Sequence, residues 1–349
     1  MTPETSPEFT HAATKRPTIT DVARAAGVSI AVVSYALNGR PGVSAATRDR
    51  VLRIADEHGW RPNAAARSLR TSSRTVGLAL VRGDSAATHP SYFVDLLSGI
   101  QDALAASGLA LALQLVDDHE SAAALYKSWW AERRFDAVLV TDVQTEDPRI
   151  KTLRALRIPA VALCHPRAAR GLACVWVDEE EAYRRVGDYL VNLGHTRVGT
   201  VTGPANLDMS VRRSAALREA VEDRGASMIL APSLASHEAG AGATRRLLID
   251  AEPPSAIVFD TDLWAVTALD VARRLRKDVP WDLSIVSAND SAACRLTTPS
   301  VTTLPHPAVA LGAAAATAVL DLLDGAQDIQ RMLPVGPLTV RGTTAPFGR

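Results

Sequence analysis

Residues 18–38, TITDVARAAGVSIAVVSYALN, have the pattern of two short helices joined by a tight turn. Thr18 can cap the first helix, because Asp21 follows three residues later in the capping-box position. Gly27 fits the turn, since a helix end commonly needs a positive φ angle that glycine adopts at little cost. Ser29 stands where the second helix needs its cap. The stretch therefore predicts helix, turn and helix.

A third helix should cover the first two, because two helices this short cannot bury enough apolar surface by themselves. Residues 44–59 supply one, with Ser44 as its cap and Gly59 as its stop. Val51 and Ile54 lie on its inward face. Three helices with a glycine turn between the first two form a helix-turn-helix unit, which places its second helix in the major groove of DNA. We therefore expect an all-α DNA-binding head.

The distribution of charge also favours a nucleic-acid partner. The whole chain has a formal net charge of zero, but residues 15–74 hold 11 Lys or Arg and only 4 Asp or Glu. Residues 75–349 hold 27 basic and 32 acidic residues, so the rest of the chain is mildly acidic. A basic head on an acidic body suits a polyanion.

Export and membrane signals are missing from the sequence. The first 16 residues, MTPETSPEFTHAATKR, lack the apolar core of a signal peptide. The longest apolar run, residues 308–316, is shorter than the roughly 20 residues that a membrane span needs. Cys164, Cys174 and Cys294 have no metal-binding or redox spacing and suit reduced thiols. We expect a soluble cytoplasmic protein without metal or cofactor.

Four segments follow one another along the chain. We expect a disordered tail over residues 1–15, the helix-turn-helix domain over 16–60, a hinge helix and linker over 61–74, and a body over 75–349. The hinge sequence AAARSL has good helix propensity but only about two turns of length, and isolated helices that short are unstable in water. The hinge is thus either an order–disorder switch or a plain linker.

The body alternates short apolar strands with amphipathic helices. Short, nearly continuous apolar strands separated by helices imply parallel sheets buried on both faces. Nine strand candidates are too many for one small sheet, so we expect two doubly wound parallel-sheet lobes with a ligand cleft beyond the carboxyl ends of their strands. The strands are expected at 75–81, 109–116, 137–141, 160–163, 173–177, 198–202, 227–230, 256–259 and 283–287, and helices at 92–106, 179–193, 212–224 and 263–276.

Seven motifs resemble the lac repressor (LacI/GalR) family of bacterial transcription regulators. In the head and hinge they are TITDVARAAGVS, VVSYALN, VSAATRDRV and RPNAAARSL, and in the body LGHTRVG, VPWDLSIV and PSVTTLPHP. One such motif alone is a weak signal. These seven follow one another in the family's order and spacing from Thr18 to about Thr344, nearly the whole chain.

The resemblance implies a homodimer whose body looks like a periplasmic sugar-binding protein. Three crossing strands join two lobes, with lobe 1 at about 75–177 and 306–335 and lobe 2 at about 178–305 and 336–349. A small-molecule effector in the cleft, a sugar or related metabolite, shifts the lobes, changes the order of the hinge and so alters operator affinity. Two symmetry-related heads imply a pseudo-palindromic operator in double-stranded DNA. The resemblance thus implies a repressor and not an enzyme.

Base readout should fall to the start and middle of the second helix. Ile30 and Ala31 offer only apolar contacts, for which the thymine methyl is the natural target, and Tyr35 adds one hydroxyl. Val32 stands where the family usually has Thr, which removes one possible hydroxyl contact to phosphate. Phosphate contacts, which fix register but not sequence, suit three polar neighbours: Ser29, Ser34 and Asn38.

The hinge residue Leu69 has the most specific expected role. By the resemblance, paired hinge helices enter the minor groove, and a leucine from each wedges into the central base step and kinks the DNA. Arg67 and Arg70 would flank it near the DNA backbone or the groove edges. The alternative is that Leu69 packs only against its dimer mate.

Six residues are expected to bind the effector. Arg213 stands where the family has a ligand-binding arginine, although the neighbouring Arg212 could be the equivalent instead. Asn289 replaces the usual ligand-binding Asp and Thr261 the usual Asn, so the ligand need not be a simple sugar. A cleft that is never occupied is the alternative. The remaining three residues are Tyr92, Phe93 and Asp178.

The remaining polar residues suit structural roles, and two other functions are less well supported by the sequence. The acidic run 179–181 suits a helix N-terminus through the helix dipole, and His195 suits a structural turn. No G-x-G-x-x-G or Walker-type loop follows a strand, which argues against a nucleotide-dependent enzyme on the same α/β body. A cytosolic solute-binding protein without a DNA role is the other alternative, and the basic head argues against it.

We predict that Leu69→Ala strongly weakens operator binding and leaves effector binding unchanged, because the wedge is lost while the cleft is untouched. Fluorescence anisotropy with a labelled operator measures the first quantity, and isothermal titration calorimetry measures the second. An operator affinity equal to that of the parent protein would show that Leu69 does not enter the DNA.

Overall fold

The computed structural model describes residues 18–37, 41–58, 75–82, 90–233 and 236–348. These fall into two units that divide between residues 72 and 73, and each unit is described by itself. Five residues named above lie outside the described ranges, so their expected roles stay predictions: Asn38, Gly59, Arg67, Leu69 and Arg70.

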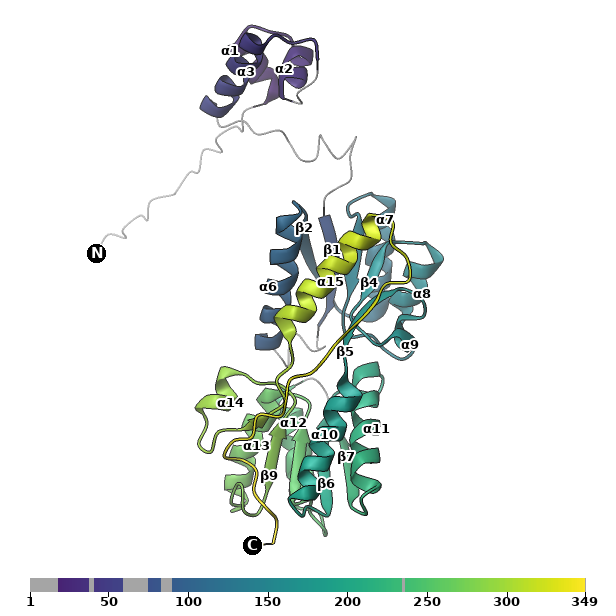
Figure 1. Cartoon of the computed structure of the whole chain (residues 1–349), viewed down its shortest axis with the longest axis vertical. Coiled ribbons are helices and arrows are strands. Elements are labelled where there is room, and N and C mark those ends of the chain that lie inside the picture. Colours follow the sequence, from purple (N-terminus) through teal and green to yellow (C-terminus); the bar gives the residue numbers. More distant parts are fainter. Residues whose placement is uncertain (1–17, 38–40, 59–74, 83–89, 234–235, 349) are drawn as a thin grey trace, which may run out of the picture. The chain divides into compact units, whose positions relative to one another are not determined.

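The first unit contains the three predicted helices (Figure 1). Thr18 and Asp21 form the predicted capping box, in which the Asp21 carboxylate accepts a hydrogen bond from the Thr18 amide at 2.9 Å. Gly27 has a φ of 63°, so the tight turn also forms as predicted. The helices are α1 (Ile19–Ala26), α2 (Ile30–Leu37) and α3 (Ala45–Glu57).

Apolar residues from all three helices meet in one small core. Val22 of α1, Val33 of α2 and Val51 of α3 are completely buried. Each such burial contributes about 1.5–3 kcal/mol, which fixes α2 against its neighbours. Within the described ranges no single helix is long and apolar enough to cross a membrane, and α1 and α2 pass that test of length and composition only as a pair bent by 100°.

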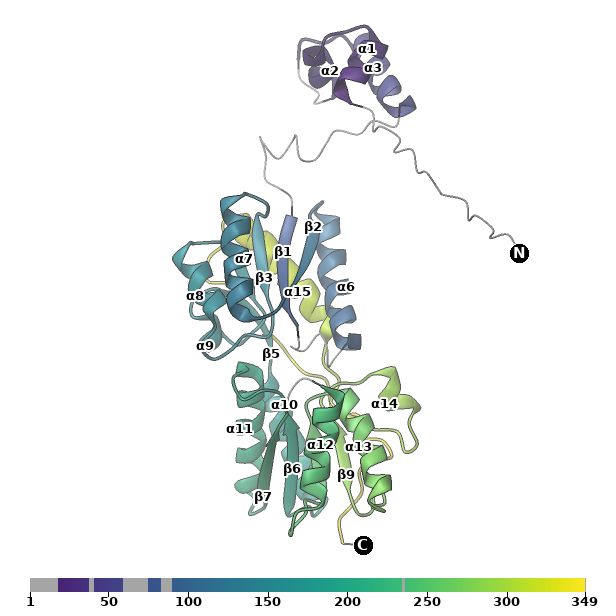
Figure 2. The same cartoon turned by 180° about the vertical axis from the view of Figure 1, so that it is seen from behind.

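The second unit contains two parallel sheets, which confirms the predicted architecture (Figures 1 and 2). We call the layers around the first sheet lobe 1; its strand order is β11-β5-β4-β3-β1-β2. Helices α6 and α15 cover one face of this sheet, and α7 and α8 cover the other. The strands are β1 (Thr75–Val81), β2 (Ala110–Val116), β3 (Ala137–Val140), β4 (Ala160–Ala162), β5 (Ala173–Val177) and β11 (Gln330–Leu333). The helices are α6 (Pro90–Ala106), α7 (His119–Ala131), α8 (Pro148–Ala155), α9 (Pro166–Ala169) and α15 (Ala308–Leu323).

Lobe 2 surrounds the second sheet, whose strand order is β10-β9-β8-β6-β7. Helices α10 and α11 cover one face, and α12 and α13 cover the other (Figures 1 and 2). The strands are β6 (Arg197–Thr202), β7 (Ser227–Pro232), β8 (Ala256–Phe259), β9 (Ser284–Ser287) and β10 (Thr302–Thr303). The helices are α10 (Glu179–Asn192), α11 (Asp208–Glu222), α12 (His237–Leu248), α13 (Asp262–Arg274) and α14 (Ala292–Leu296).

All nine predicted strands are present, with ends that differ by at most two residues. The two strands that the sequence did not predict, β10 and β11, lie at sheet edges. β10 is only two residues long, and β11 exposes alternate side chains to solvent. Neither forms the buried apolar run of a central strand, so only pairing with β9 and β5 defines them.

The chain passes between the lobes three times (Figure 1). It crosses from β5 to α10, from β10 to α15, and again after β11. The carboxyl ends of β3 and β5 and the first turns of α10 and α11 therefore meet at the junction between the lobes. Open parallel sheets bind their ligands at this edge.

Helices α6 and α15 touch through their backbones at two glycines. A Cβ atom on Gly99 would lie 2.0 Å from the carbonyl oxygen of Val309. One on Gly312 would lie 2.2 Å from the carbonyl oxygen of Leu96. Backbone atoms cannot turn aside as the end of a flexible side chain can, so this contact requires glycine on both helices.

We predict that Gly312→Ala lowers the free energy of unfolding by about 3 kcal/mol, because the added methyl forces α15 away from α6. Urea denaturation followed by circular dichroism measures the change. Gly242→Ala is the matched control, since its Cβ would meet only the end of Arg246 at 3.7 Å. Alanine is the better helix former, so the control should gain about 0.5–1 kcal/mol. Equal stability of the two variants would show that α6 and α15 are not in backbone contact.

Candidate functional site

The outer face of α2 carries large side chains that the head does not bury. Ile30 and Tyr35 are 48% and 42% exposed, and Ala31 is exposed beside them. Ser29 accepts a hydrogen bond from the Val32 amide at 3.3 Å, which confirms its predicted cap and fixes the start of the helix. The side chains predicted to contact bases thus share one accessible face.

A pocket lies at the junction of the lobes, where ligand binding is expected. Its walls come from α6, α15, β5 and the loops after β3 and β4 in lobe 1, and from α10, α11 and the loop after β9 in lobe 2. Its cavity volume is about 80 Å³, enough for several water molecules. Most of its wall is apolar, and its charged side chains are Asp142, Glu179, Asp208, Arg212 and Arg213.

An ion pair between Glu179 and Arg213 forms one wall of this pocket. Arg213 Nε donates to Glu179 Oε2 at 2.8 Å, and Nη2 donates to Oε1 at 2.9 Å. The two side chains are 8% and 4% exposed. Two parallel charge-assisted hydrogen bonds fix both groups in one plane. The first turn of α10 is thereby tied to α11.

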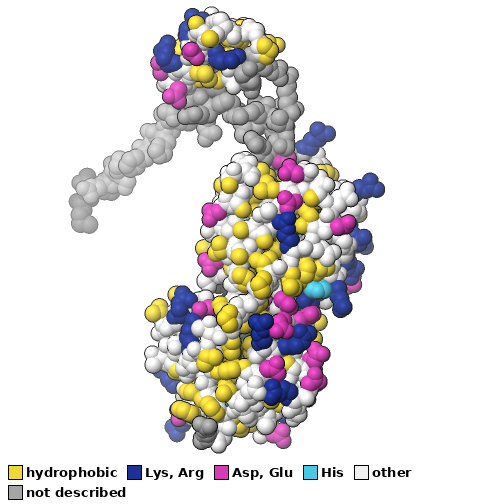
Figure 3. Space-filling view, in the orientation of Figure 1, with side chains coloured by type: hydrophobic (Ala, Val, Ile, Leu, Met, Phe, Trp, Pro, Cys, Tyr) yellow, Lys and Arg dark blue, Asp and Glu magenta, His cyan; other side chains and the backbone are white. Residues whose placement is uncertain are grey.

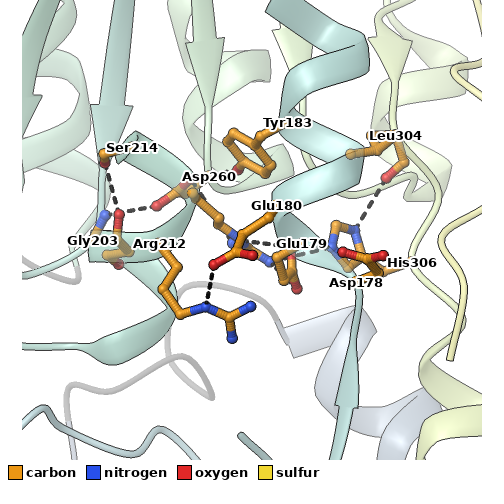
Figure 4. Close-up of polar contacts among 12 residues, drawn as sticks. Asp178, Glu179, Glu180, Tyr183, Gly203, Arg212, Ser214, Asp260, Leu304 and His306 are labelled. Atoms are coloured by element: carbon orange, nitrogen blue, oxygen red, sulfur yellow. Dashed lines mark hydrogen bonds and ion pairs between the residues drawn. The ribbon is translucent and has the colours of Figure 1, made fainter. Parts of the chain in front are cut away.

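His306 extends this ion pair to the crossing between β10 and α15. Its Nε2 lies 2.9 Å from Glu179 Oε2, and its Nδ1 lies 3.2 Å from the carbonyl oxygen of Leu304 (Figure 4). The ring of Tyr92, from α6 of lobe 1, meets the imidazole edge to face with centroids 6.4 Å apart. A chain of contacts therefore runs from lobe 1 through the crossing segment to the buried charges of lobe 2.

Asp260 adds a second buried carboxylate behind Arg213. The Tyr183 hydroxyl donates to Asp260 Oδ1 at 2.5 Å, and the Gly203 amide donates to Oδ2 at 3.1 Å (Figure 4). Arg213 Nη1 lies 3.8 Å from Asp260, and its guanidinium lies over the Tyr183 ring at 5.4 Å. Arg213 is thus enclosed by partners from α10 and the end of β8.

The buried charges shift one another's protonation equilibria. Burial alone would raise the pKa of Glu179, but the charges of Arg213 and His306 outweigh it and hold that pKa well below its usual range. Burial alone would lower the pKa of Arg213, but the charge of Glu179 outweighs it and raises that pKa well above its usual value. Burial raises the pKa of Tyr183. Glu179 and Arg213 therefore remain an ion pair at neutral pH.

A second arginine lies beside the first and is also paired. Arg212 Nε donates to Glu180 Oε1 at 3.0 Å (Figure 4). Its Nη1 lies 3.9 Å from Asp208, too far for a hydrogen bond. Burial raises the pKa of Asp208, and Arg212 offsets only part of that effect. Both arginines that were candidates for the ligand contact thus reach the pocket with a glutamate already bound.

Backbone hydrogen bonds close the lobes together on one side of the pocket. The Asp208 amide of lobe 2 donates to the Val143 carbonyl of lobe 1 at 3.0 Å. The Thr145 amide donates to the Asn206 carbonyl at 2.9 Å, and residues 144 and 207 pair between them as an antiparallel bridge. We call residues 143–145 and 206–208 the inter-lobe bridge. It ties the loop after β3 to the start of α11.

The structure brings together four of the six residues predicted for the cleft. Tyr92, Phe93, Arg213 and Asn289 line the pocket. The other two do not lie on its wall, because their side chains cap helices: Asp178 accepts from the Glu181 amide at the start of α10, and Thr261 accepts from the Trp264 amide at the start of α13.

Sequence reasoning missed Glu179, which it assigned only to the helix dipole. Glu179 does lie in the first turn of α10, but its side chain is taken up by Arg213 and His306. The sequence does contain two adjacent glutamates, 179 and 180, and two adjacent arginines, 212 and 213, which could pair. Such a pairing could not be read as a contact, because more than 30 residues separate the partners along the chain.

No group of three or more His, Cys, Asp or Glu in the described part of the chain is arranged to hold a metal ion. Cys164 and Cys174 are buried free thiols, and burial raises the pKa of both. His195, expected at a structural turn, is buried with its Nδ1 2.9 Å from the Ser255 hydroxyl.

We predict that Glu179→Gln lowers the free energy of unfolding at pH 7 by about 3–5 kcal/mol, because it leaves Arg213 buried without its partner charge. The folded pKa of Glu179 is depressed, so its stabilisation is fully present above the unfolded pKa of about 4.3. It is lost as the pH falls from there towards the lower folded pKa. The difference between the two proteins should therefore shrink below about pH 4, as measured by urea denaturation at several pH values.

Glu222→Gln is the matched control for this prediction. Glu222 pairs with Arg218 at 3.2 Å on the outer face of α11, where both side chains are more than 40% exposed. An exposed pair of this kind contributes about 0.5 kcal/mol or less. A loss in Glu179→Gln no larger than in this control would contradict a structural role for the buried pair.

Family models match both the head and the body of the chain. Residues 18–63 match the family model described as bacterial regulatory proteins, lacI family, and residues 187–344 match the periplasmic binding protein-like domain. A solved structure described as the transcriptional regulator CelR–cellobiose complex covers 94% of this chain and 100% of its own, with a TM-score of 0.72 and 26% identity.

Two transcriptional regulators are similar to this chain over most of its length. The transcriptional repressor PurR of Escherichia coli is 27% identical over 329 residues, which are 92% of this chain and 94% of that protein. The transcriptional regulator AglR of Rhizobium meliloti is 30% identical over 273 residues, which are 76% of this chain and 75% of that protein. The chain therefore belongs to the lacI family of bacterial regulatory proteins.

Proposed function

We propose that this protein is a transcriptional repressor that binds a specific operator and responds to a small molecule in the inter-lobe pocket. The observation that carries the proposal is the pairing of two sites in one chain. A helix-turn-helix head presents an exposed recognition face on α2, and a two-lobed body encloses a pocket at the carboxyl ends of its strands. The curated relatives are named as transcriptional regulators, which agrees with a DNA-binding head and a ligand-binding body.

The head reads DNA through two kinds of contact. Ile30 and Ala31 contact thymine methyl groups in the major groove, and the Tyr35 hydroxyl makes one hydrogen bond to a base edge. Phosphate contacts come from Ser29, Ser34 and Asn38. The excess of basic residues in this part of the chain adds attraction that depends steeply on salt. In the hinge, Leu69 wedges into the minor groove between Arg67 and Arg70.

The effector binds between the lobes. Tyr92 and Phe93 of lobe 1, and Arg213 and Asn289 of lobe 2, line the pocket and form its contacts. The pocket has little open volume while the inter-lobe bridge is closed, so a ligand must alter the angle between the lobes to enter. The cellobiose complex of the similar solved structure supports a small-molecule site in this fold. The change in the lobes then alters the order of the hinge and with it operator affinity.

The protein acts as a homodimer in the cytoplasm, where the chromosome lies. Large apolar side chains remain exposed on lobe 1, among them Val94 of α6 and Val309 of α15, which are 65% and 51% exposed. Figure 3 shows hydrophobic side chains gathered over these two helices. A second copy covers this face, and the two heads then read the half-sites of a pseudo-palindrome.

The test is selection of the full-length protein on random DNA duplexes, followed by sequencing. We expect a palindromic consensus with a fixed centre and an affinity whose logarithm falls linearly with the logarithm of salt concentration. Because the effector could be required for binding, the selection is run both with and without a cell metabolite extract. No enrichment in either condition would overturn the proposal.

We predict that Tyr35→Ala weakens binding to the selected operator about tenfold or more, because it removes a base contact from the exposed face of α2. Fluorescence anisotropy with the selected operator measures the affinity. Trp281→Ala is the control, since Trp281 is an aromatic residue of lobe 2 that is 65% exposed and far along the chain from the head. Equal operator affinity of the two variants would show that Tyr35 does not contact the DNA.

A further inference from the structure

Both arginines in the pocket are already neutralised by carboxylates of the same chain. Arg213 donates two hydrogen bonds to Glu179 and has Asp260 as a second acid 3.8 Å away. Arg212 donates to Glu180. An anionic ligand at Arg213 would have to displace Glu179 and leave it buried without a partner, which is strongly unfavourable, and at Arg212 it would compete with Glu180. The pocket is therefore poorly suited to carboxylate or phosphate ligands.

Negative charge exceeds positive charge on the pocket wall. Among the residues that line the pocket, three are acids, Asp142, Glu179 and Asp208, and two are the arginines described above. His165 also lines the pocket, but burial, followed by the charge of Arg212, lowers its pKa from the ordinary value near 6.5, so the ring is neutral at pH 7. The balance of these groups favours a ligand with positive charge.

Asp208 is the acid best placed to receive that charge. Among the described residues no donor makes a hydrogen bond to its carboxylate, and Arg212 Nη1 lies 3.9 Å away. Its side chain is only 15% exposed, and its amide is held by the inter-lobe bridge. Glu179, in contrast, is bound by Arg213 and by His306. A cation at Asp208 would compensate a carboxylate that the protein itself leaves underpaired.

Aromatic rings line the lobe 1 side of the pocket. Trp176 of β5 meets His165 edge to face with ring centroids 5.7 Å apart, and Tyr92 and Phe93 of α6 lie on the same wall. The faces of indole and phenyl rings attract organic cations. Most of the remaining wall is aliphatic and offers few partners for the many hydroxyl groups of a sugar: Leu96, Val143, Leu163, Val175, Val177, Leu207 and Leu311.

From these observations we propose that the effector is a small organic cation, an amine on an aromatic or aliphatic ring, whose ammonium group binds Asp208. Its ring lies against Trp176, Tyr92 and Phe93. The inference rests on the proposed function, because it assumes that the inter-lobe pocket is the effector site. It goes beyond that function by assigning the chemical class of the ligand.

The experiment uses matched ligands that share a ring and differ in charge. Tryptamine, tryptophol and indole-3-acetate form one series, phenethylamine, 2-phenylethanol and phenylacetate form another, and cellobiose represents a sugar. Each is titrated into the full-length protein by isothermal titration calorimetry, with the shift of melting temperature as a second measurement. We expect at least one amine to bind at least tenfold more tightly than its carboxylate and its alcohol. Tighter binding of a carboxylate, an alcohol or cellobiose, or no binding by either amine, would overturn the proposal.

Substitution at Asp208 tests where the charge is held. Asp208→Asn keeps the amide that forms the inter-lobe bridge and should weaken amine binding at least tenfold while leaving binding of the alcohol unchanged. Asp188→Asn is the control, because Asp188 is a half-exposed acid of α10 that pairs with Arg224 and lies outside the pocket wall. Equal amine affinity in the Asp208 variant and the control would place the cation elsewhere and overturn the assignment.

Operator binding without ligand separates failure of this inference from failure of the proposed function. If the protein binds its selected operator and a carboxylate or cellobiose changes that affinity, the proposed function stands and the cationic effector is refuted. A protein that selects no operator refutes the proposed function, whichever ligand its pocket prefers.

Discussion

The buried ion pair between Glu179 and Arg213 is the constraint on which the lobe junction depends. Removing two charges from water costs several kcal/mol for each ion, and attraction offsets this only when the geometry is good and the remaining polar atoms are satisfied. Both conditions hold, because the pair is bidentate and His306 occupies the second site on Glu179 Oε2. The pair therefore fixes α10, α11 and the crossing segment in one arrangement, and with them the pocket wall.

Contacts between the lobes are weaker than this ion pair. The inter-lobe bridge consists of backbone hydrogen bonds, and each such bond contributes only about 1 kcal/mol net. Tyr92 adds a ring contact to His306 rather than an ion pair. A buried ion pair thus holds lobe 2 together at the junction, while weaker contacts join it to lobe 1. This is the distribution expected of a molecule in which a ligand selects between two lobe arrangements.

Much of the fold could be predicted because its signals are local. Thr18 and Asp21, the partners of the capping box, are three positions apart, and Gly27 ends the same helix; both features formed as predicted. The central strands were also found, since burial on both faces requires an apolar run. The edge strands β10 and β11 were missed because an edge tolerates polar and very short segments. Asp178 and Thr261 occupy the expected loops, but whether such a side chain caps its own helix or faces a ligand is decided by a few ångströms of backbone placement.

The helix-turn-helix head, the α/β body and the class of regulator can all be predicted from the amino-acid sequence, because periodicity, caps and motif order encode them. The chemistry of the pocket cannot, because it arises from contacts between distant parts of the fold. Glu179 and Arg213 are 34 residues apart, and His306 lies a further 93 residues beyond Arg213. Their meeting depends on how two sheets and three crossings stack in space, which no local pattern encodes. For the same reason no local pattern shows that Arg213, which lines the pocket, is also held in an internal ion pair.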